Sequence, residues 1–479
     1  MVLTVDIGTS VFKTAIWDFN GNRIAFAASK LVINSSDSLY YEADSNQWIE
    51  AFEDCCGVLS GTIKLSTIDA VVICGNGPSL TPTIGEPNFS KSGLSIQAAP
   101  VRLWLDKRAA CRQVSAIIGG YVDPCFLLPK ALDIKINEPL FYDKTKYFLG
   151  CPEFLAYALT GEARTVFPSD GFDRWFWTEK TLEQLGLEKE KFPPFIRPGE
   201  NFGGLSVQAA SYFGLNPGIP VICGGPDFFA AILGCGVIKP GQACDRCGTS
   251  EGINACTETR ILNDRFMSYG HPIKPYWNLS GIISTAGKAV EWACNILGIK
   301  SYNLFFKAAE TSPAGAGGLV FLPYLAGERL FADNTAQPLQ IGGTFSGLNL
   351  STGQGELARS VLEGINFAIL DIIFEMEKAG AGINELCVAG GIFTNKLLNQ
   401  IKADILQRPV IVPQQKEAEL MGLALIGSCY CGKYSSFEEA ASTLVKTDKT
   451  FLPCRQKTDL YNNLFLRYHK LKENLLFRG

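Results

Sequence analysis

The sequence predicts an α/β protein made of two domains of related design that face a cleft. Its 479 residues are too many for one ordinary core. Strand-like and helix-like segments alternate along most of the chain, which is typical of sheets flanked by helices. A Gly-Thr-Ser turn at 8–10 occurs again at 248–250, where strand-like residues surround it once more. We therefore expect domains over 1–242 and 243–479.

The first domain is expected to open with three antiparallel strands, over 2–7, 12–19 and 23–28. The Gly-Thr-Ser turn joins the first two, and Asn20-Gly21, a strong two-residue hairpin signal, joins the next two. Helices and strands then alternate. In order, we expect a helix over 46–63, strands over 69–74 and 100–105, helices over 106–118, 150–159 and 205–213, and a strand over 218–223. The aromatic stretch 167–177 is expected to pack as a cap or lid.

The second domain repeats this alternation with parallel-sheet character. A glycine-rich turn at 315–318 precedes a strand over 319–322, and the chain ends in an amphipathic helix over 459–475. The remaining expected elements are helices over 286–297, 303–310, 356–379, 395–406 and 417–429, and strands over 386–389 and 410–412.

The segment 223–252 joins the two domains. A Gly-Gly-Pro loop leads to a lone acid, Asp227, at the start of the apolar helical run 228–233. An acid at that place can be a plain helix cap. Its position in the middle of the chain and the repeated Gly-Thr-Ser turn favour a functional role instead.

Composition excludes several classes of function. The net charge is −4 without long runs of one sign, so nucleic acid and membrane surfaces are not expected as partners. The N-terminus resembles a strand rather than a signal peptide, which predicts a cytoplasmic protein. Sixteen scattered cysteines predict reduced, buried thiols. Only His271 and His469 are present, so acid–base chemistry is expected from carboxylates.

The two usual glycine-rich nucleotide motifs are missing from the sequence. It contains neither the P-loop pattern nor a Gly-x-Gly-x-x-Gly turn after the first strand. The paired Gly-Thr-Ser turns offer backbone N–H groups and hydroxyls, which can hold phosphate oxygens. Asp6, just before the first turn, could hold Mg²⁺ through water molecules.

Several motifs in a fixed order resemble the FGGY-type carbohydrate kinases of the actin-like ATPase superfamily, along essentially the whole chain. The motifs are Val5–Ser10 with Lys13, Trp104-x-Asp106-x-Arg108, Leu159–Glu162, Gly248–Ser250, Gly318–Arg329, Gly343–Leu348, Glu356–Glu363, and Gly390-Gly391-x-x-x-Asn395 with Ala403–Leu406. The resemblance implies two actin-like (ribonuclease H-like) domains with mixed sheets, flanked by helices, around a central cleft.

The resemblance also implies a role for each matching residue. Asp227 would be the general base that takes the proton from a sugar hydroxyl, and Asp6 would orient hydrated Mg²⁺. The residues implied to hold the β- and γ-phosphates of ATP are Gly8, Thr9, Ser10, Lys13, Gly248 and Thr249. Those implied to line the adenosine site are Gly287, Gly391 and Asn395. Those implied on the sugar side are Asn76, Trp104, Asp106 and Phe228, with Asp227.

Structural roles remain open for some of these residues. Trp104 can be a core residue rather than a platform for the sugar, and Asp106 can serve only to pair with Arg108. Gly390-Gly391 can be a helix-entry turn, and the aromatic stretch 167–177 can simply pack.

This sequence departs from the family mainly on the sugar side. Phe228 stands where the family usually has glutamine after the catalytic acid, and Asn76-Gly77-Pro78-Ser79 replaces a Gln-Met-His-Gly loop. Val11-Phe12 stands where glycerol kinases carry small hydroxyl residues, and Leu330-Phe331 replaces the common Thr-Pro. We expect an ATP-dependent kinase for a ketose or polyol, closest to xylulokinases, and possible homodimer formation. The alternatives are a deoxysugar kinase of the fuculose or rhamnulose type, and a nucleotide-binding regulatory protein that has lost sugar turnover.

Overall fold

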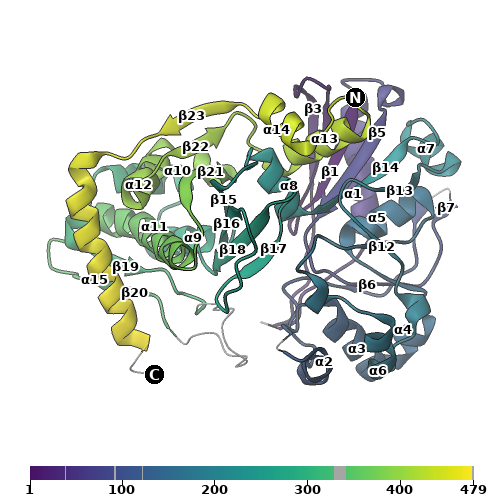
Figure 1. The fold of residues 1–479 in the computed structure, drawn as a ribbon, viewed down its shortest axis with the longest axis horizontal. Helices are drawn as coiled ribbons and strands as arrows, with labels where there is room; N and C mark the ends of the chain where they lie inside the picture. The colour runs from purple at the N-terminus through teal and green to yellow at the C-terminus, as the bar shows by residue number, and fades with distance from the viewer. Residues whose placement is uncertain (38, 91–92, 121, 328–340, 477–479) are drawn as a thin grey trace. The chain divides into compact units, whose positions relative to one another are not determined.

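The chain folds into two compact units. We used a computed structural model, which describes residues 1–37, 39–90, 93–120, 122–327 and 341–476 (Figure 1). Unit 1 comprises Met1–Gly234 and Glu419–Leu444, and unit 2 comprises Cys235–Ala418 and Val445–Gly479. The change between units comes before the expected boundary at residue 242, and the sequence did not indicate that the chain returns to unit 1 at Glu419.

Unit 1 contains a six-stranded mixed sheet in the order β13-β14-β5-β1-β2-β3. β1, β2 and β3 form the expected antiparallel opening, and β5 and β14 run parallel to β1. The strands are β1 (Val2–Ile7), β2 (Val11–Trp17), β3 (Arg23–Lys30), β5 (Ala70–Gly75), β13 (Asn201–Gly204) and β14 (Pro220–Pro226). Every residue of β1 and β5 is buried, as expected for central strands covered on both faces.

The helices of unit 1 bury apolar residues against this sheet. In α1, the expected inward positions Trp48, Phe52 and Leu59 are all buried, which confirms the pattern. Three helices contact strands of the sheet: α1 (Asn46–Ser60), α5 (Cys151–Thr160) and α8 (Asp227–Gly234). Helix α13 (Ala418–Tyr430) reaches the sheet through Gly427, whereas α7 (Val207–Phe213) packs on α5 and α14 (Phe437–Leu444) packs on α8.

The expected strand 100–105 and helix 106–118 are both shorter than predicted. The strand, β9, covers only Val101–Arg102, and the helix, α2, covers only Arg112–Ile118. Asp106 accepts hydrogen bonds from the N–H groups of Tyr41 (3.0 Å) and Arg108 (3.3 Å). These side chain–backbone bonds compete with helix formation, so the chain passes residue 106 as a turn.

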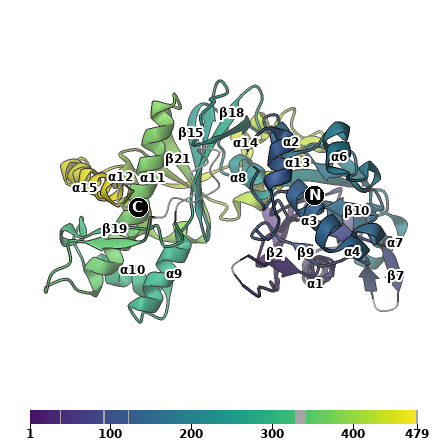
Figure 2. The same ribbon diagram turned by 90° about the horizontal axis from the view of Figure 1, so that it is seen from below.

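Residues 119–200, which gave little pattern in the sequence, hold three more helices. α3 (Leu127–Asn137), α4 (Pro139–Lys144) and α6 (Glu179–Leu185) lie together with α2 in unit 1 (Figures 1 and 2). Leu128, Leu132 and Leu182 belong to their shared apolar cluster, which is separate from the core under the sheet.

Unit 2 contains a seven-stranded mixed sheet in the order β17-β18-β16-β15-β21-β22-β23. Its strands are β15 (Gly241–Cys247), β16 (Glu251–Thr257), β17 (Met267–Gly270), β18 (Trp277–Ile283), β21 (Ile383–Ala389), β22 (Val410–Pro413) and β23 (Thr447–Phe451). β16 and β18 follow β15 in antiparallel order, and β21 and β22 run parallel to β15. This is the order of unit 1 repeated, so the prediction of two domains of related design is confirmed.

The helices of unit 2 include a long buried one, α11. This helix, α11, covers Gln354–Lys378. It contacts α9 (Gly287–Ile296), α10 (Tyr302–Glu310), α12 (Lys396–Leu406) and α15 (Thr458–Leu476). A two-stranded antiparallel sheet of β19 (Val320–Leu322) and β20 (Thr344–Ser346) packs on α11 through β19. None of the helices in the described ranges is long and apolar enough to cross a membrane.

All sixteen cysteines are free thiols, of which eleven are buried and five are partly buried. The thiols are free, in agreement with the expectation of reduced cysteines. The expectation that all of them are buried is wrong for the five that are partly buried.

The return of the chain to unit 1 depends on glycines in α13. A Cβ atom on Gly422 would collide with the backbone oxygen of Ala230 in α8, and one on Gly427 would lie 2.6 Å from a Val2 methyl group in β1. In β14, a Cβ atom on Gly224 would collide with Leu423. Helix α13 therefore packs directly on the sheet and on the helix that begins with Asp227.

We predict that Gly422→Ala destabilises the protein by about 1–3 kcal/mol, because the added methyl group forces α13 away from α8. Gly57→Ala is the matched control. Gly57 lies in α1, and a Cβ there meets no atom within 4 Å. The control should therefore stabilise by about 0.5–1 kcal/mol. Chemical unfolding measures the free energy of unfolding of each variant. If the two variants changed it equally and in the same direction, the close packing of α13 would be contradicted.

Candidate active site

Two carboxylates of unit 1 stand at the same edge of its sheet. Asp6 lies near the C-terminal end of β1 and is buried, and Asp227 follows β14 as the first residue of α8. β5 runs between these strands, with Cys74 paired in register with both Asp6 and Gly225. Carboxyl ends of parallel strands are where α/β sheets bind ligands.

The charges of both carboxylates act on the buried thiols beneath this edge. Burial raises the pKa of Cys74 well above its usual value, and the charges of Asp6, Asp227 and Glu419 raise it further. The Cys74 Sγ lies 3.5 Å from the Asp6 carboxylate. For Cys151, burial is again the main cause of a raised pKa, with smaller contributions from the charges of Glu153, Asp227 and Asp6. Asp6 and Asp227 thus share one neighbourhood.

Sequence reasoning missed Glu419 as a member of this neighbourhood. It stands in the first turn of α13, ahead of an apolar helical run. That is the pattern by which Asp227 was singled out, so the signal was present in the sequence. Glu419 had no partner motif nearby to draw attention to it.

The first Gly-Thr-Ser turn is tight and is connected to the expected sugar side. A Cβ atom on Gly8 would lie 2.5 Å from the Val11 carbonyl oxygen, so the turn requires glycine. The indole N–H of Trp104, which is half-buried, donates a hydrogen bond of 2.9 Å to the Thr9 hydroxyl. Lys13 pairs in register with Asp6 across β1 and β2. Ser10 accepts a backbone hydrogen bond from Leu31 N–H.

Asn76 and Asp106 make internal hydrogen bonds. The Asn76 amide donates to the Ile7 carbonyl oxygen (2.9 Å) and accepts from the Ser79 hydroxyl (2.7 Å). The Asp106 carboxylate is fully buried, 2.6 Å from the Arg108 guanidinium. Pairing with Arg108 is therefore present, and a sugar contact by Asp106 stays a prediction.

Aromatic rings lie beside Asp227. The ring of Phe228 stacks on that of Phe172, with centroids 6.1 Å apart. Phe172 contacts Trp175, which stacks on Phe126 with centroids 5.5 Å apart. Phe172 and Trp175 are buried, so packing is their observed role in the stretch 167–177. Phe228 is only partly buried and presents an apolar surface at this place.

In unit 2, the second Gly-Thr-Ser turn packs against the start of α9. The Gly287 N–H donates to the Gly248 carbonyl oxygen (3.2 Å), and a Cβ atom on Gly287 would collide with that oxygen. The Thr249 carbonyl oxygen accepts hydrogen bonds from Ala286 N–H and Lys288 N–H. The turn and the helix start therefore form one rigid piece.

The Gly390-Gly391 turn lies on the other side of β15. A Cβ atom on Gly390, whose φ is +120°, would collide with the Cys247 carbonyl oxygen. Around Gly391, by contrast, a Cβ atom would meet nothing within 4 Å. Packing against Cys247 therefore explains why residue 390 is glycine. Packing does not explain the glycine at 391, which has open space beside it. Asn395 caps α12 by accepting from Leu398 N–H (3.0 Å).

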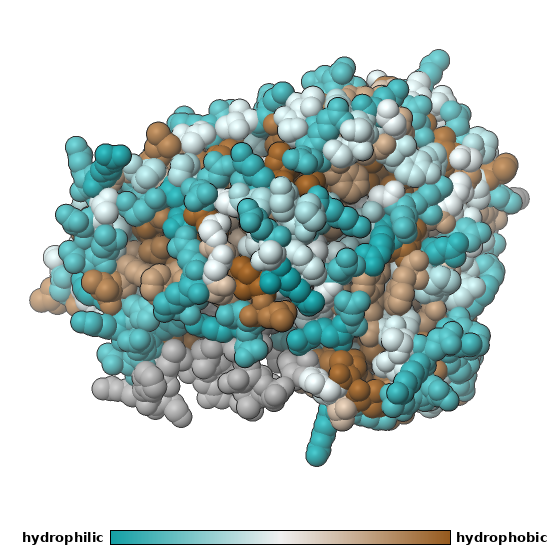
Figure 3. Space-filling view, viewed as in Figure 1, coloured by the Kyte–Doolittle hydropathy of each residue, from teal (hydrophilic) through white to brown (hydrophobic). Residues whose placement is uncertain are grey.

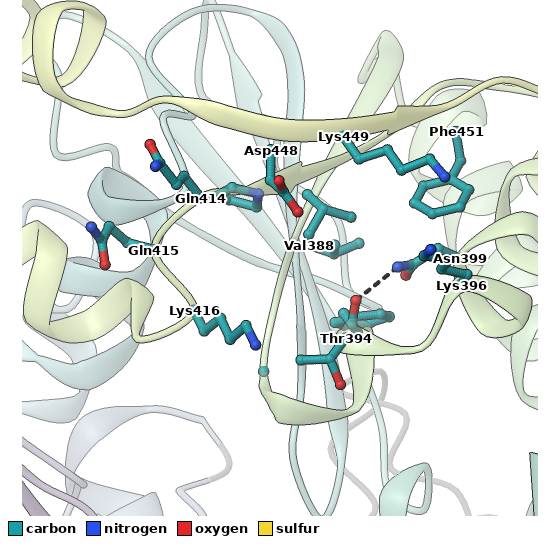
Figure 4. Close-up of a pocket in the computed structure, with 14 residues that line it drawn as sticks. Val388, Thr394, Lys396, Asn399, Gln414, Gln415, Lys416, Asp448, Lys449 and Phe451 are labelled. Atoms are coloured by element: carbon teal, nitrogen blue, oxygen red, sulfur yellow. Dashed lines mark hydrogen bonds between the residues drawn. The ribbon is translucent and has the colours of Figure 1, made fainter. Parts of the chain in front are cut away.

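A small pocket borders this turn on the side of β22 and β23 (Figure 4). It encloses about 140 Å³, close to the size of a cavity that holds a single benzene ring. Gly390, Phe393, Thr394, Asn399, Lys416 and Lys449 are among its lining residues. Gly391 and Asn395 are not among them, although their chain neighbours Gly390, Thr394 and Lys396 are.

Part of one motif lies outside the described residues. The motif that starts at Gly318 ends with Glu328 and Arg329, which lie outside the described residues. The departure at Leu330-Phe331 lies outside them as well.

Comparison with known proteins decides the family. Residues 1–234 match the N-terminal domain of the FGGY family of carbohydrate kinases, and residues 245–430 match its C-terminal domain. The chain belongs to the FGGY family of carbohydrate kinases. The resemblance seen in the motifs is thereby confirmed, together with the mixed α/β fold of two actin-like domains.

Individual relatives are distant but span the whole length. A xylulose kinase of Staphylococcus epidermidis is 26% identical, with 98% of this chain and 96% of the relative covered. One of Bacillus subtilis is 24% identical, covering 98% and 96%. The solved structure of a xyloylose (xylulose) kinase from Brucella ovis is 26% identical, with a TM-score of 0.85, and covers 100% of this chain and 99% of that one.

We predict that Gly391→Ala weakens ATP binding about tenfold, equal to about 1.4 kcal/mol, while its unfolding midpoint stays unchanged. The methyl group would enter space that no protein atom fills. Gly287→Ala is the matched comparison. Its methyl group collides with Gly248, so both ATP binding and the unfolding midpoint should fall. Calorimetric titration and thermal unfolding measure the two effects. Unchanged ATP affinity in Gly391→Ala would remove Gly391 from the adenosine site.

Proposed function

We propose that this protein transfers the γ-phosphoryl group of ATP to a hydroxyl group of a ketose or polyol of the xylulose type. The observation that carries the proposal is the placement of Asp6 and Asp227 at the carboxyl ends of two parallel strands on either side of β5, in a chain of the carbohydrate kinase family. Relatives named as xylulose kinases, aligned over nearly the whole chain, support the choice of sugar.

In the proposed reaction, the Asp227 carboxylate accepts the proton of the sugar hydroxyl. The hydroxyl oxygen forms a bond to the γ-phosphorus of ATP while the bond to the β–γ bridging oxygen breaks, and ADP leaves. Phosphoryl transfer depends mainly on positioning and charge neutralisation. Backbone N–H groups and hydroxyls of the two Gly-Thr-Ser turns supply contacts for the phosphates, and Lys13 supplies a positive charge.

The proposed site also fits Mg²⁺. Asp6 offers carboxylate oxygens at the end of β1, and Mg²⁺ is usually held by one or two carboxylates, water and substrate phosphates. Asp6 would hold the hydrated ion. When bound, Mg²⁺ neutralises charge on the β- and γ-phosphates.

A specific observation favours a second candidate for the sugar. Phe228 and Phe172 place an apolar stack beside Asp227, where the resembling kinases usually have a glutamine. Such a surface suits a sugar that lacks a hydroxyl group, so a deoxysugar kinase is the alternative. A regulatory protein without sugar turnover is a further alternative, although Asp6, Asp227 and Thr249 are all retained.

Two other expectations stay predictions: a cytoplasmic location and a homodimer. The face drawn in Figure 3 mixes hydrophilic side chains with small separate groups of apolar ones. Such scattered apolar residues are normal on protein surfaces and do not mark an interface.

We predict that Asp227→Asn lowers the rate of sugar-stimulated ADP release by a factor of about 10²–10⁴, because an amide cannot accept the proton. ATP affinity, measured by calorimetric titration, should change less than about twofold, on the order of 0.4 kcal/mol. Glu179→Gln, which removes an exposed carboxylate of the same unit, is the control and should keep full activity. Full activity of Asp227→Asn would show that Asp227 is not the general base.

We predict that Phe228→Gln shifts the sugar preference. The ratio of kcat/KM for a fully hydroxylated ketose to that for its deoxy counterpart should rise by about 2–10-fold, the worth of one added hydrogen bond. Phe141→Gln, at a partly exposed position in α4, should leave the ratio unchanged. Kinetics with the two sugars measure this effect. An equal change for both sugars would mean that Phe228 only supports the aromatic stack.

A further inference from the structure

Three ionisable side chains of unit 2 are buried together beneath the second Gly-Thr-Ser turn. The Lys402 ammonium, on α12, lies 2.5 Å from the Asp245 carboxyl of β15 and 2.6 Å from the Glu251 carboxylate of β16. Their exposed fractions are 1%, 0% and 2%. The ammonium also lies 5.1 Å from the centre of the Phe393 ring.

The charges of this cluster do not balance if all three groups ionise. Two carboxylates and one ammonium would leave one buried negative charge, which is very unfavourable away from water. Among the described residues, Asp245 has no hydrogen-bond donor beside it other than the Lys402 ammonium. Two carboxyl groups that share a buried site keep a proton on one of them.

The surroundings identify Asp245 as the group that keeps the proton. Burial, and next the Glu251 charge, raise the pKa of Asp245 well above its usual value. Burial alone would raise the pKa of Glu251, but the Lys402 charge and the hydrogen bond from Asp245 lower it. Burial also raises the pKa of the adjacent Cys247 thiol, which therefore stays neutral.

The same three residues connect the elements that carry the proposed nucleotide contacts. Asp245 and Glu251 belong to the two strands that the turn with Gly248 and Thr249 joins, and Cys247 pairs with Glu251 at its base. Asp245 also pairs in register with Val388, just before the Gly390-Gly391 turn. Lys402 belongs to α12, which Asn395 caps. One cluster therefore ties both turns to one helix.

We propose that Asp245, Glu251 and Lys402 form a buried cluster with one retained proton. This cluster positions the second Gly-Thr-Ser turn and the Gly390-Gly391 turn relative to each other for ATP binding. They act as positioning residues, because each acts through the turns that it holds. The link to ATP rests on the proposed function, whereas the retained proton is a property of the folded chain alone.

The retained proton gives a spectroscopic test. At pH 7, an infrared difference spectrum between the unmodified protein and Asp245→Asn should show one protonated-carboxyl band that is lost in the variant. The folded state binds this proton and the unfolded state releases it above pH 4–5, so stability falls as pH rises towards the raised pKa of Asp245. We therefore compare the equilibrium constant for unfolding of the unmodified protein with that of Asp245→Asn. Their ratio should rise by up to tenfold for each pH unit between pH 4–5 and the raised pKa of Asp245.

The positioning role is tested with Lys402→Met against a matched control, Lys472→Met. Lys472 is also a buried lysine of unit 2, paired at 2.5 Å with Asp371 but on α15. Both variants should be less stable. At a temperature where both are folded, Lys402→Met should weaken ATP binding at least tenfold, and Lys472→Met less than twofold. The triple variant with Asp245→Asn, Glu251→Gln and Lys402→Met, which buries no charge, should recover stability and part of the affinity.

Distinct results would overturn each part. An unchanged infrared spectrum in Asp245→Asn, with lower stability at every pH, would mean that Asp245 is ionised and would overturn the retained proton. Equal ATP affinities of the two lysine variants would overturn the positioning role. If the unmodified protein does not bind ATP, the proposed function fails, while the infrared result still decides whether the proton is retained.

Discussion

Parallel pairing of β1, β5 and β14 is the constraint on which the rest of the site in unit 1 depends. Parallel strands end at a common edge, so Asp6 and Asp227, far apart in the sequence, become neighbours. Glycines 224, 422 and 427 then allow α13 to lie directly on this sheet and on α8. This packing brings the late segment 419–444 back to unit 1, where the Glu419 charge helps to raise the pKa of Cys74. Unit 2 uses the same strand order to place its two turns on either side of β15.

The two units manage buried charge in different ways. In unit 1, Asp6, Asp227 and Glu419 concentrate negative charge at the edge of the sheet, above thiols that burial keeps neutral. Such an edge suits a cation together with phosphate groups, as in the proposed reaction. In unit 2, the carboxyls of Asp245 and Glu251 face one ammonium, which balances the cluster only with a retained proton. In our two proposals, the charges of unit 2 position backbone turns, and the charges of unit 1 take part in the reaction.

Much of the fold could be predicted because its central strands and long helices carry strong local patterns. The hairpin signal at Asn20-Gly21 and the apolar stripe of α1 needed no knowledge of distant contacts. The start of α2 could not be predicted in this way, because Asp106 bonds to Tyr41, a residue from another segment. The return of α13 to unit 1 depends on contacts of Gly422 with Ala230, far away in the sequence.

The candidate site shows the same limit. The turns and Asp227 were visible as motifs, since each is local. Glu419, the stack of Phe228 on Phe172, and the cluster around Lys402 depend on residues brought together only by folding. Pairing of Asp106 with Arg108 could be named in advance as an alternative to a sugar contact, because the two residues are close in the sequence.

The measurement that tests the central claim most directly is ADP release from ATP by the unmodified protein across a panel of ketoses, polyols and deoxysugars. The account predicts that one class of these sugars strongly stimulates ADP release over the rate without sugar. Tight ATP binding without stimulation by any sugar of the panel would contradict it and favour a nucleotide-binding regulatory protein.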